Sequence, residues 1–263
     1  MLNTKNVPTS PRLSVIIPAR NDAVALGRTL DHLSGLSGMS AAEVIVAASG
    51  DCEGTERAVA GRARLVWPVG STRAVLMNAG AASAHGGVLL FLHADSFPPA
   101  GAFELIEYAL SDERVVGGAF EHRFVEPVWS LRVISWINRI RYRLTHNYYG
   151  DQGIFVHASV FWQLRGYREV GIMEDLDFTH RLKLLGRTVV IRVPLRTSGR
   201  RFLTRGPWRT FAFIVWLLLL HTLRLDSQRY AERWRGPADH PPGSSWPNGR
   251  LRDMGRSSSD GGC

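Results

Sequence analysis

Residues 88–95 read VLLFLHAD, a run of five apolar residues that stops at His93. An apolar run of this length predicts a strand that is buried on both faces, as in a parallel sheet. Asp95 follows the strand end, and its carboxylate is a hard oxygen ligand that suits Mg²⁺ or Mn²⁺ bridging two phosphates. Two interpretations stand at this point: Asp95 binds a metal, or it only caps the turn before Pro98. For His93 three roles remain: it binds the metal, it contacts a residue that binds the metal, or it only shapes the turn.

Strands and helices alternate around this run. Strands are predicted at 13–18 (LSVIIP), 43–48 (EVIVAA) and 64–67, and helices at about 21–33, 55–61 and 72–84, the first of which would bury Val24, Leu26, Leu30 and Leu33. This alternation predicts βαβ units and a mostly parallel sheet. Ligands bind such sheets at the carboxyl ends of the strands, so the loops at 21–22, 48–51 and 93–95 should share one rim.

The second half of the chain is less regular. Strands are predicted at 115–124, 153–156 and 188–193, with a basic amphipathic helix at 129–144 and another helix at 175–185. The predicted fold class is α/β, with a Rossmann-like, mostly parallel central sheet and flanking helices. We expect a disordered N-terminus over 1–12, one globular domain over 13–205, an apolar C-terminal helix over 206–232, and a disordered tail rich in Gly, Ser, Pro and Arg over 233–263.

The chain is strongly basic, with 32 Lys and Arg against 23 Asp and Glu and a pI of about 10.3. Such a balance favours anionic partners: phosphate-bearing substrates, an anionic membrane face or nucleic acid. No nucleic-acid-binding motif accompanies the charge, so we expect no nucleic-acid partner. The two cysteines, Cys52 and Cys263, are too few for a disulfide framework or a zinc site, which indicates a reducing, cytoplasmic setting.

Residues 211–220 (FAFIVWLLLL) form an apolar segment of ten residues. A membrane-spanning helix needs about 20, so this segment is too short to cross a bilayer. It is either a buried helix or dimer face, or a helix that lies in the membrane interface. In the second case its anchors are Arg200, Arg201, Arg205, Arg209, Trp208 and Trp216, and the protein is peripheral on the inner face of an anionic membrane.

Three carboxylates open the predicted helix at 175–185, within residues 173–177 (MEDLD). They are either first-turn acids that complement the helix dipole, or one of them is a general base that takes a proton from an acceptor hydroxyl. The helical turn spreads neighbouring residues around the axis, so only one or two of these acids can face the rim.

Basic and amide side chains supply candidate phosphate contacts. Arg73 and Asn78 lie on the predicted helix at 72–84, where Arg73 is a candidate phosphate partner or a solvated arginine. Arg200 and Arg201 follow the last strand, and they either close over a leaving diphosphate or form a solvated, membrane-facing basic loop.

Five blocks occur together in order, LSVIIPARND (13–22), EVIVAASGDCEGT (43–55), RAVLMNAGAASAHGGVLLFLHADS (73–96), GDQGIFVHASVF (150–161) and MEDLDFTHRLKLLG (173–186). Together they resemble family 2 glycosyltransferases of the GT-A fold, and more narrowly the branch called selenodomain-associated (or radical-SAM/selenodomain-associated) transferases. The segment TSGRRFLTRGPWRT (197–210) and the apolar helix after it also match that branch. The resemblance covers roughly residues 13–230.

The resemblance implies a nucleotide-diphosphate sugar donor, a divalent cation (Mg²⁺ or Mn²⁺) and inversion at the anomeric carbon. Asp95 matches the last Asp of the usual Asp-x-Asp metal motif, and Asp175 matches the catalytic base of the Glu-Asp motif, with Glu174 beside it. Asp151 and Gln152 lie where the acceptor side is expected. The expected donor-binding residues are Pro18, Ala19, Asn21, Asp22, Ala48, Arg73, Asn78, His93, Ala94, Asp95, Arg200 and Arg201.

Two positions depart from the family pattern. Ala48 stands where relatives carry an acid that reads the nucleotide base, and Asp51 is the candidate substitute. His93 replaces the first Asp of Asp-x-Asp, although His-Ala-Asp is itself usual in the branch. No Gln-x-x-Arg-Trp motif follows the catalytic base, Asp175, and this absence disfavours a processive polysaccharide synthase.

Two further expectations concern the acceptor and the main alternative. The acceptor is unidentified, and the apolar C-terminal helix would suit a lipid-like alcohol. The alternative function is a catalytically inactive GT-A-fold binding module at the membrane surface. Ala48 favours that alternative, whereas the presence of Asp95 and Asp175 argues against it.

Overall fold

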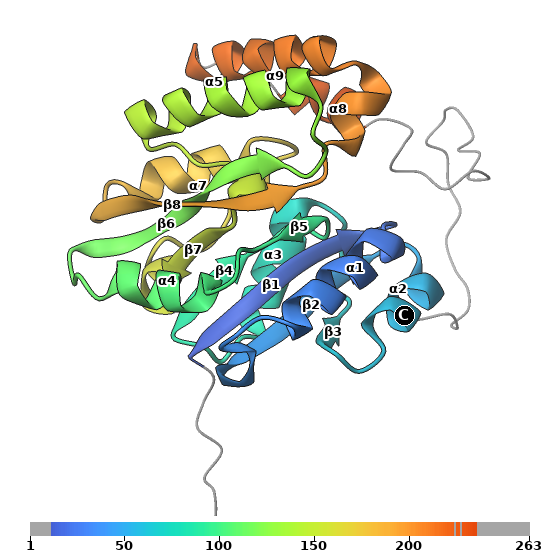
Figure 1. Cartoon of the computed structure of the whole chain (residues 1–263), viewed down its shortest axis with the longest axis vertical. Coiled ribbons are helices and arrows are strands. Elements are labelled where there is room, and N and C mark those ends of the chain that lie inside the picture. The colour runs from blue at the N-terminus through green and yellow to red at the C-terminus, as the bar shows by residue number, and fades with distance from the viewer. Residues whose placement is uncertain (1–11, 224, 227, 236–263) are drawn as a thin grey trace, which may run out of the picture.

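The computed structural model describes residues 12–235 except 224 and 227. An eight-stranded sheet in the order β3-β2-β1-β4-β7-β6-β8-β5 forms its centre (Figure 1). The strands are β1 (Leu13–Arg20), β2 (Ala42–Ser49), β3 (Arg64–Val66), β4 (Val88–Phe91), β5 (Ser96–Phe97), β6 (Val115–Phe124), β7 (Ile154–His157) and β8 (Arg187–Thr197). The pairs β1–β2, β1–β4, β2–β3 and β6–β8 are parallel, whereas β4–β7, β6–β7 and β5–β8 are antiparallel. The predicted α/β class with a mostly parallel sheet is confirmed.

Helices cover both faces of the sheet (Figure 1). One face carries α1 (Ala23–Ser34), α2 (Cys52–Val59) and α4 (Ala102–Leu110), and the other carries α3 (Arg73–Ala82), α6 (Ala158–Gln163) and α7 (Glu174–Leu182). At one end of the molecule α5 (Trp129–Thr145) packs on β6, with α8 (Arg200–Arg205) and α9 (Pro207–Thr222) beside it. Shorter turns are η1 (Met39–Ala41), η2 (Gly150–Gln152), η3 (Gln228–Tyr230) and α10 (Ala231–Arg235).

The apolar run of β1 is buried on both faces because the side chains of a strand alternate between the two layers. Val15 and Ile17 pack with the layer of α1, whereas Ile16 packs with the layer of α3. Gly80 lets α3 approach closely, since a Cβ at that position would lie 2.5 Å from Ile16 Cγ2. The Thr72 side chain accepts a hydrogen bond from the Val75 amide and starts α3. These contacts fix the end of α3 that faces the rim of the sheet.

Some predicted details are wrong. Val24 is 69% exposed, because α1 turns Leu26, Leu30 and Leu33 toward the sheet and leaves Val24 on the other side. The C-terminal segment over 206–232 is not one helix, since α9 ends at Thr222 and further turns follow at η3 and α10. The strand predicted at 188–193 extends to Thr197 as β8, which carries the following residues to the rim. The predicted disordered ends lie mostly outside the described residues.

Candidate active site

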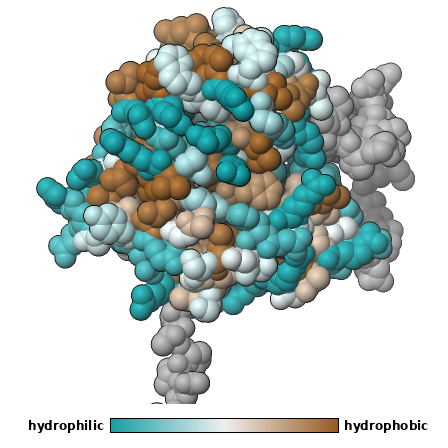
Figure 2. Space-filling view, viewed as in Figure 1, coloured by the Kyte–Doolittle hydropathy of each residue, from teal (hydrophilic) through white to brown (hydrophobic). Residues whose placement is uncertain are grey.

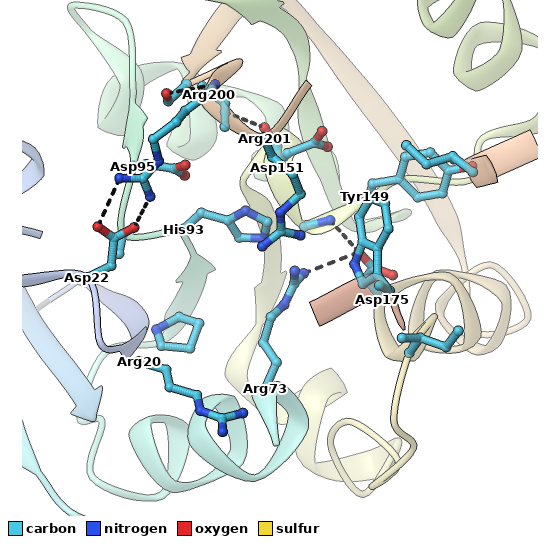
Figure 3. Close-up of a pocket in the computed structure, with 18 of the residues that line it drawn as sticks. Arg20, Asp22, Arg73, His93, Asp95, Tyr149, Asp151, Asp175, Arg200 and Arg201 are labelled. Atoms are coloured by element: carbon cyan, nitrogen blue, oxygen red, sulfur yellow. Dashed lines mark hydrogen bonds and ion pairs between the residues drawn. The ribbon is translucent and has the colours of Figure 1, made fainter. Parts of the chain in front are cut away.

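A cavity of about 570 Å³ lies at the carboxyl ends of β1 and β4 (Figure 3). Asn21 and Asp22 after β1 and His93, Ala94 and Asp95 after β4 line it, because parallel neighbouring strands end at one edge of the sheet. The third predicted loop lies next to them. Its Asp51 amide donates a hydrogen bond of 2.9 Å to Asn21 Oδ1, although Asp51 itself does not line the cavity. The three loops therefore share one rim, as predicted.

Carboxylates and a guanidinium group meet at the Asp95 end of the cavity. Burial first, and the Asp22 carboxylate second, raise the pKa of Asp95 to about 6, against the opposing effect of Arg200 and Arg201. Arg200 Nη2 lies 2.6 Å from Asp22 Oδ2, and Figure 3 shows this pair beside Asp95. Asp95 is thus a partly buried carboxylate whose negative charge is incompletely compensated.

The chemistry of this end fits a divalent cation. Across the described part of the chain, no group of three or more His, Cys, Asp and Glu side chains is arranged to hold a metal. A cation would take one carboxylate from the protein, that of Asp95, and its other ligands from diphosphate oxygens and water, as Mg²⁺ usually does. It would also remove the electrostatic cost of placing Asp95 near Asp22.

The opposite end of the cavity is built around Asp175 at the start of α7. Asp175 Oδ2 accepts hydrogen bonds from the Gly150 amide at 2.6 Å and from Arg73 Nη2 at 3.2 Å. Arg73 Nε lies 3.0 Å from Glu174 Oε1, so one guanidinium spans both acids. Although burial opposes its charge, Glu174 and Asp175 raise the pKa of Arg73. The Asp175 carboxylate is therefore held in one orientation at the cavity wall.

Gly150 is required where η2 passes these side chains. A Cβ there would collide with Arg73 Nη2 and would lie 2.6 Å from His93 Nε2. The absence of a side chain lets the Gly150 amide reach Asp175 while Arg73 stays in place. The Gly150 amide, the Arg73 guanidinium and the Asp175 carboxylate are therefore held together by direct hydrogen bonds.

His93 and Asp151 lie between the two ends of the cavity (Figure 3). His93 Nε2 is buried and has no hydrogen-bond partner among the described residues. Burial, followed by the cations Arg73 and Arg201, lowers the pKa of His93 well below its usual value, so the imidazole is neutral. Asp151 Oδ2 lies 3.6 Å from His122 Nε2. These side chains are polar groups that a ligand in the cavity can reach.

Several predicted site residues lie elsewhere. Ala19 and Ala48 are buried in the core and do not line the cavity, because their side chains point between the sheet and the α1 layer. Asn78 is also outside, since its amide is used by the Tyr167 backbone: Nδ2 donates to the carbonyl at 2.8 Å and Oδ1 accepts from the amide at 2.9 Å. The assignment of these three residues to donor binding is not supported by their positions.

Gln152 is likewise a structural residue in this conformation. Only 1% of it is exposed, its Nε2 donates to the Phe120 carbonyl, and its Oε1 accepts from the Tyr149 amide. Gln152 does not line the cavity, so its position does not support the predicted acceptor contact, whereas Asp151 beside it does line the cavity. The helical turn of η2 directs the two neighbouring side chains to different sides.

Other lining residues were not predicted. They are mainly polar near β1 and β8 and apolar near the C-terminus, and include Arg20, Tyr149, Thr197, Ser198, Phe202, Phe211, Ile214, Leu217 and Trp234. Arg20 and Tyr149 adjoin predicted positions in the chain and could have been found by extending the motifs. The C-terminal residues reach the cavity only through tertiary packing, which no local pattern indicates.

The sequence model described as glycosyl transferase family 2 matches residues 14–171, more than half of the chain. No curated protein sequence is significantly similar to it. The chain therefore belongs to glycosyl transferase family 2.

Solved structures share the fold. A mannosyltransferase from Pyrobaculum calidifontis, solved in complex with GDP-Man and Mn²⁺, has a TM-score of 0.61 at 20% identity, over 78% of this chain and 61% of that one. S. aureus TarS in complex with UDP-GlcNAc has a TM-score of 0.57 at 15% identity, over 71% and 58%. Glucosyl-3-phosphoglycerate synthase from Mycobacterium tuberculosis, in complex with Mn²⁺, UDP and glucosyl-3-phosphoglycerate, has 0.55 at 18%, over 82% and 81%. The chain spans about three fifths of the first two. None of these comparisons tests the selenodomain-associated branch.

Proposed function

We propose that the protein is a metal-dependent glycosyltransferase that moves a sugar from a nucleotide-diphosphate donor to an acceptor hydroxyl, with inversion at the anomeric carbon. The observation that carries this proposal is that one cavity holds the incompletely compensated Asp95 carboxylate at one end and the oriented Asp175 carboxylate at the other. Family membership and the nucleotide sugars and Mn²⁺ named for similar structures support it.

The donor binds at the Asp95 end. Pro18, Asn21 and Asp22 lie beside the nucleotide, and Arg200 and Arg201 contact the diphosphate oxygens, where bidentate guanidinium groups bind well. A bound Mg²⁺ or Mn²⁺ would neutralise negative charge on the departing diphosphate, with Asp95 as its protein ligand. Ala48 lies in the core, so the nucleotide base is read by other groups.

Asp175 acts as the general base at the other end. Its carboxylate takes the proton of the acceptor hydroxyl while the hydroxyl oxygen bonds to the anomeric carbon and the bond from that carbon to the diphosphate oxygen breaks. The electron pair of the broken bond leaves with the diphosphate. The Gly150 amide and Arg73 hold the carboxylate in position, and Glu174 holds Arg73.

Incubation with a panel of nucleotide sugars and Mn²⁺ tests this function by the release of nucleoside diphosphate. Wild type should release it from at least one donor, and Asp175→Asn should lower the rate by about 10²- to 10⁴-fold with donor affinity retained. Equal rates for the two proteins would contradict the base assignment. Donor binding without turnover in the wild type would favour the inactive binding module instead.

We also propose peripheral contact with the inner face of an anionic membrane, in an otherwise cytoplasmic protein. None of the helices in the described part of the chain is long and apolar enough to cross a bilayer. Figure 2 shows hydrophobic residues gathered where α5 and α9 lie. The large exposed side chains of these two helices include Trp129, Trp136, Trp208, Trp216 and Leu219. The exposed Arg132, Arg143 and Arg209 lie on the same two helices, as an interfacial surface requires.

Vesicle flotation tests the membrane contact. Wild type should float with vesicles that contain phosphatidylglycerol and much less with pure phosphatidylcholine, and Trp208→Ser/Trp216→Ser should stay in solution. Trp162→Ser is the matched control, because Trp162 is 50% exposed on the distant α6. Unchanged flotation of the double variant would contradict the contact.

A further inference from the structure

The cavity continues past Asp175 into an apolar wall. Its residues come from the end of the loop before α7 and from the C-terminal helices: Ile172, Met173, Phe202, Phe211, Ile214, Leu217 and Trp234. All of them lie beyond residue 171, where the family match ends. This end of the cavity therefore belongs to a part of the chain that the family match leaves unassigned.

The apolar wall is held in place by packing. Ile172 and Leu217 are buried with Ala231, and Trp234 and Met173 pack against that cluster. Phe202 and Phe211 pack against a second cluster of Phe124, Leu131 and Ile134. The wall is thus a supported surface and presents a fixed shape to a ligand.

The α9 helix has two apolar faces. Phe211, Ile214 and Leu217 follow each other at three-residue spacing, lie on one side of the helix and line the cavity. Trp208, Val215 and Leu219, which are 44%, 47% and 50% exposed, lie on the other side. A helix that is apolar all round needs an apolar neighbour on each side. On the inner face Leu217 and Phe211 already pack against the two clusters, whereas Ile214 is half-buried and belongs to neither cluster, so its side chain is the part of this face that a ligand can cover.

Arg201 lies between the Asp95 end of the cavity and the apolar wall. Its guanidinium carbon lies 5.0 Å from the centre of the Trp234 ring, so the cation covers the edge of the apolar wall. On one side of Arg201 lie the Asp95 and Asp22 carboxylates, and on the other lies hydrocarbon. A polyhydroxylated acceptor would bury hydroxyl groups against this wall without hydrogen-bond partners, which is unfavourable.

We propose that the acceptor is an amphiphilic alcohol whose hydroxyl lies at Asp175 and whose hydrocarbon chain lies against the inner face of α9. This inference rests on the proposed function. It also links the site to the outer face of the same helix, where an apolar alcohol dissolved in a membrane would be available. Each buried methylene should strengthen acceptor binding by up to about fourfold.

The experiment uses the full chain with its best donor, Mn²⁺, and straight-chain primary alcohols from 1-butanol to 1-decanol, with glycerol as the polar acceptor. The kcat/KM for the alcohol should rise with chain length and exceed that for glycerol at least tenfold. Ile214→Asn should remove most of this dependence, because Ile214 lines the cavity. Val215→Asn, one residue further and on the outer face, is the matched control and should keep it.

Direct binding separates this inference from the proposed function. Titration of 1-decanol into the protein by calorimetry needs no turnover, and wild type and Val215→Asn should bind it at least tenfold more tightly than Ile214→Asn. Binding without any donor turnover would leave the apolar site standing and contradict the proposed function. No binding, or turnover that favours glycerol or is independent of chain length, would overturn the amphiphilic acceptor.

Discussion

Arg200 Nη2 and Asp22 Oδ2 are 2.6 Å apart, although 178 positions separate the two residues in the chain. Asp22 precedes α1 and Arg200 begins α8, so this ion pair joins the segment after the first strand to the segment after β8 at the wall of the cavity. It also brings a guanidinium group next to Asp95, where the diphosphate of the donor is expected.

We predict that Arg200→Ala weakens the binding of nucleoside diphosphate and leaves the protein stable. The Arg200 side chain is 62% exposed, so loss of its ion pair should change the free energy of unfolding by no more than about 1 kcal/mol. A charge-assisted contact to phosphate is worth about 1.5–3 kcal/mol, which is roughly 10- to 100-fold in affinity. Calorimetric titration with UDP and GDP in Mn²⁺ measures the effect. Arg192→Ala, on an exposed position of β8, is the control, and an equal loss in both variants would contradict the assignment.

We predict that Asp95 is the residue through which a divalent cation supports the binding of nucleoside diphosphate. Removal of divalent cations with a chelator should abolish high-affinity binding of nucleoside diphosphate to the wild type, and Asp95→Asn should bind it weakly with or without Mn²⁺. The reason is that the amide keeps the size of the carboxylate but loses the charge that a hard cation requires. Electron paramagnetic resonance of free Mn²⁺ measures binding directly. Wild-type Mn²⁺ affinity in Asp95→Asn would show that another group holds the metal.

Gly150→Ala should disturb catalysis more than stability. The new Cβ would collide with the Arg73 guanidinium and press on His93, and Arg73 can move only by leaving Asp175 or Glu174. A displaced base should lower kcat by about 10- to 100-fold, because misplacement by about 1 Å has effects of that size. Gly87→Ala provides the comparison, since its nearest neighbour would be at an ordinary 3.9 Å. Equal kcat values for the two variants would argue against a fixed Arg73–Asp175 pair.

The strand ends of the first half could be predicted from sequence because a buried parallel strand is a continuous apolar run. The VLLFLHAD run correctly predicted that Asp95 lies at the rim. Because ligands bind at the carboxyl ends of parallel strands, Asn21 and Asp22 were predicted at the same rim, and they line the same cavity. The acids at 174–175 also line it. In each case the polar residue lies shortly after the end of a strand or opens a helix, so local sequence carried the information.

Residues whose partners are distant in sequence could not be assigned in this way. Asn78 is hydrogen-bonded to Tyr167, 89 positions away, and Arg73 is hydrogen-bonded to Asp175, 102 positions away. Whether an amide or guanidinium faces a ligand or another segment is decided by tertiary packing. The same holds for Ile214, which local sequence places on an apolar helix but not beside the cavity.

Asn78→Ala should therefore destabilise the fold and spare donor binding. The Tyr167 amide and carbonyl would both lose their partner, and each unsatisfied buried group costs about 1–3 kcal/mol. Chemical denaturation should report the loss of stability, while calorimetric titration with UDP or GDP should give an affinity within about twofold of wild type. A large fall in affinity at unchanged stability would show that Asn78 contributes to donor binding after all.

His122 should make stability depend on pH. Burial lowers its pKa, with Arg141 acting in the same direction and Asp151 in the opposite one. The unfolded chain therefore takes up a proton near pH 6.5 that the folded protein resists, so the free energy of unfolding should fall as the pH drops below about 6.5. His122→Gln removes the titrating ring, and although it loses the contact of that ring with Phe124, this loss is the same at every pH. Denaturation of both proteins from pH 8 to pH 5 should give a steeper fall for the wild type, and parallel curves would show that His122 is protonated equally well in both states.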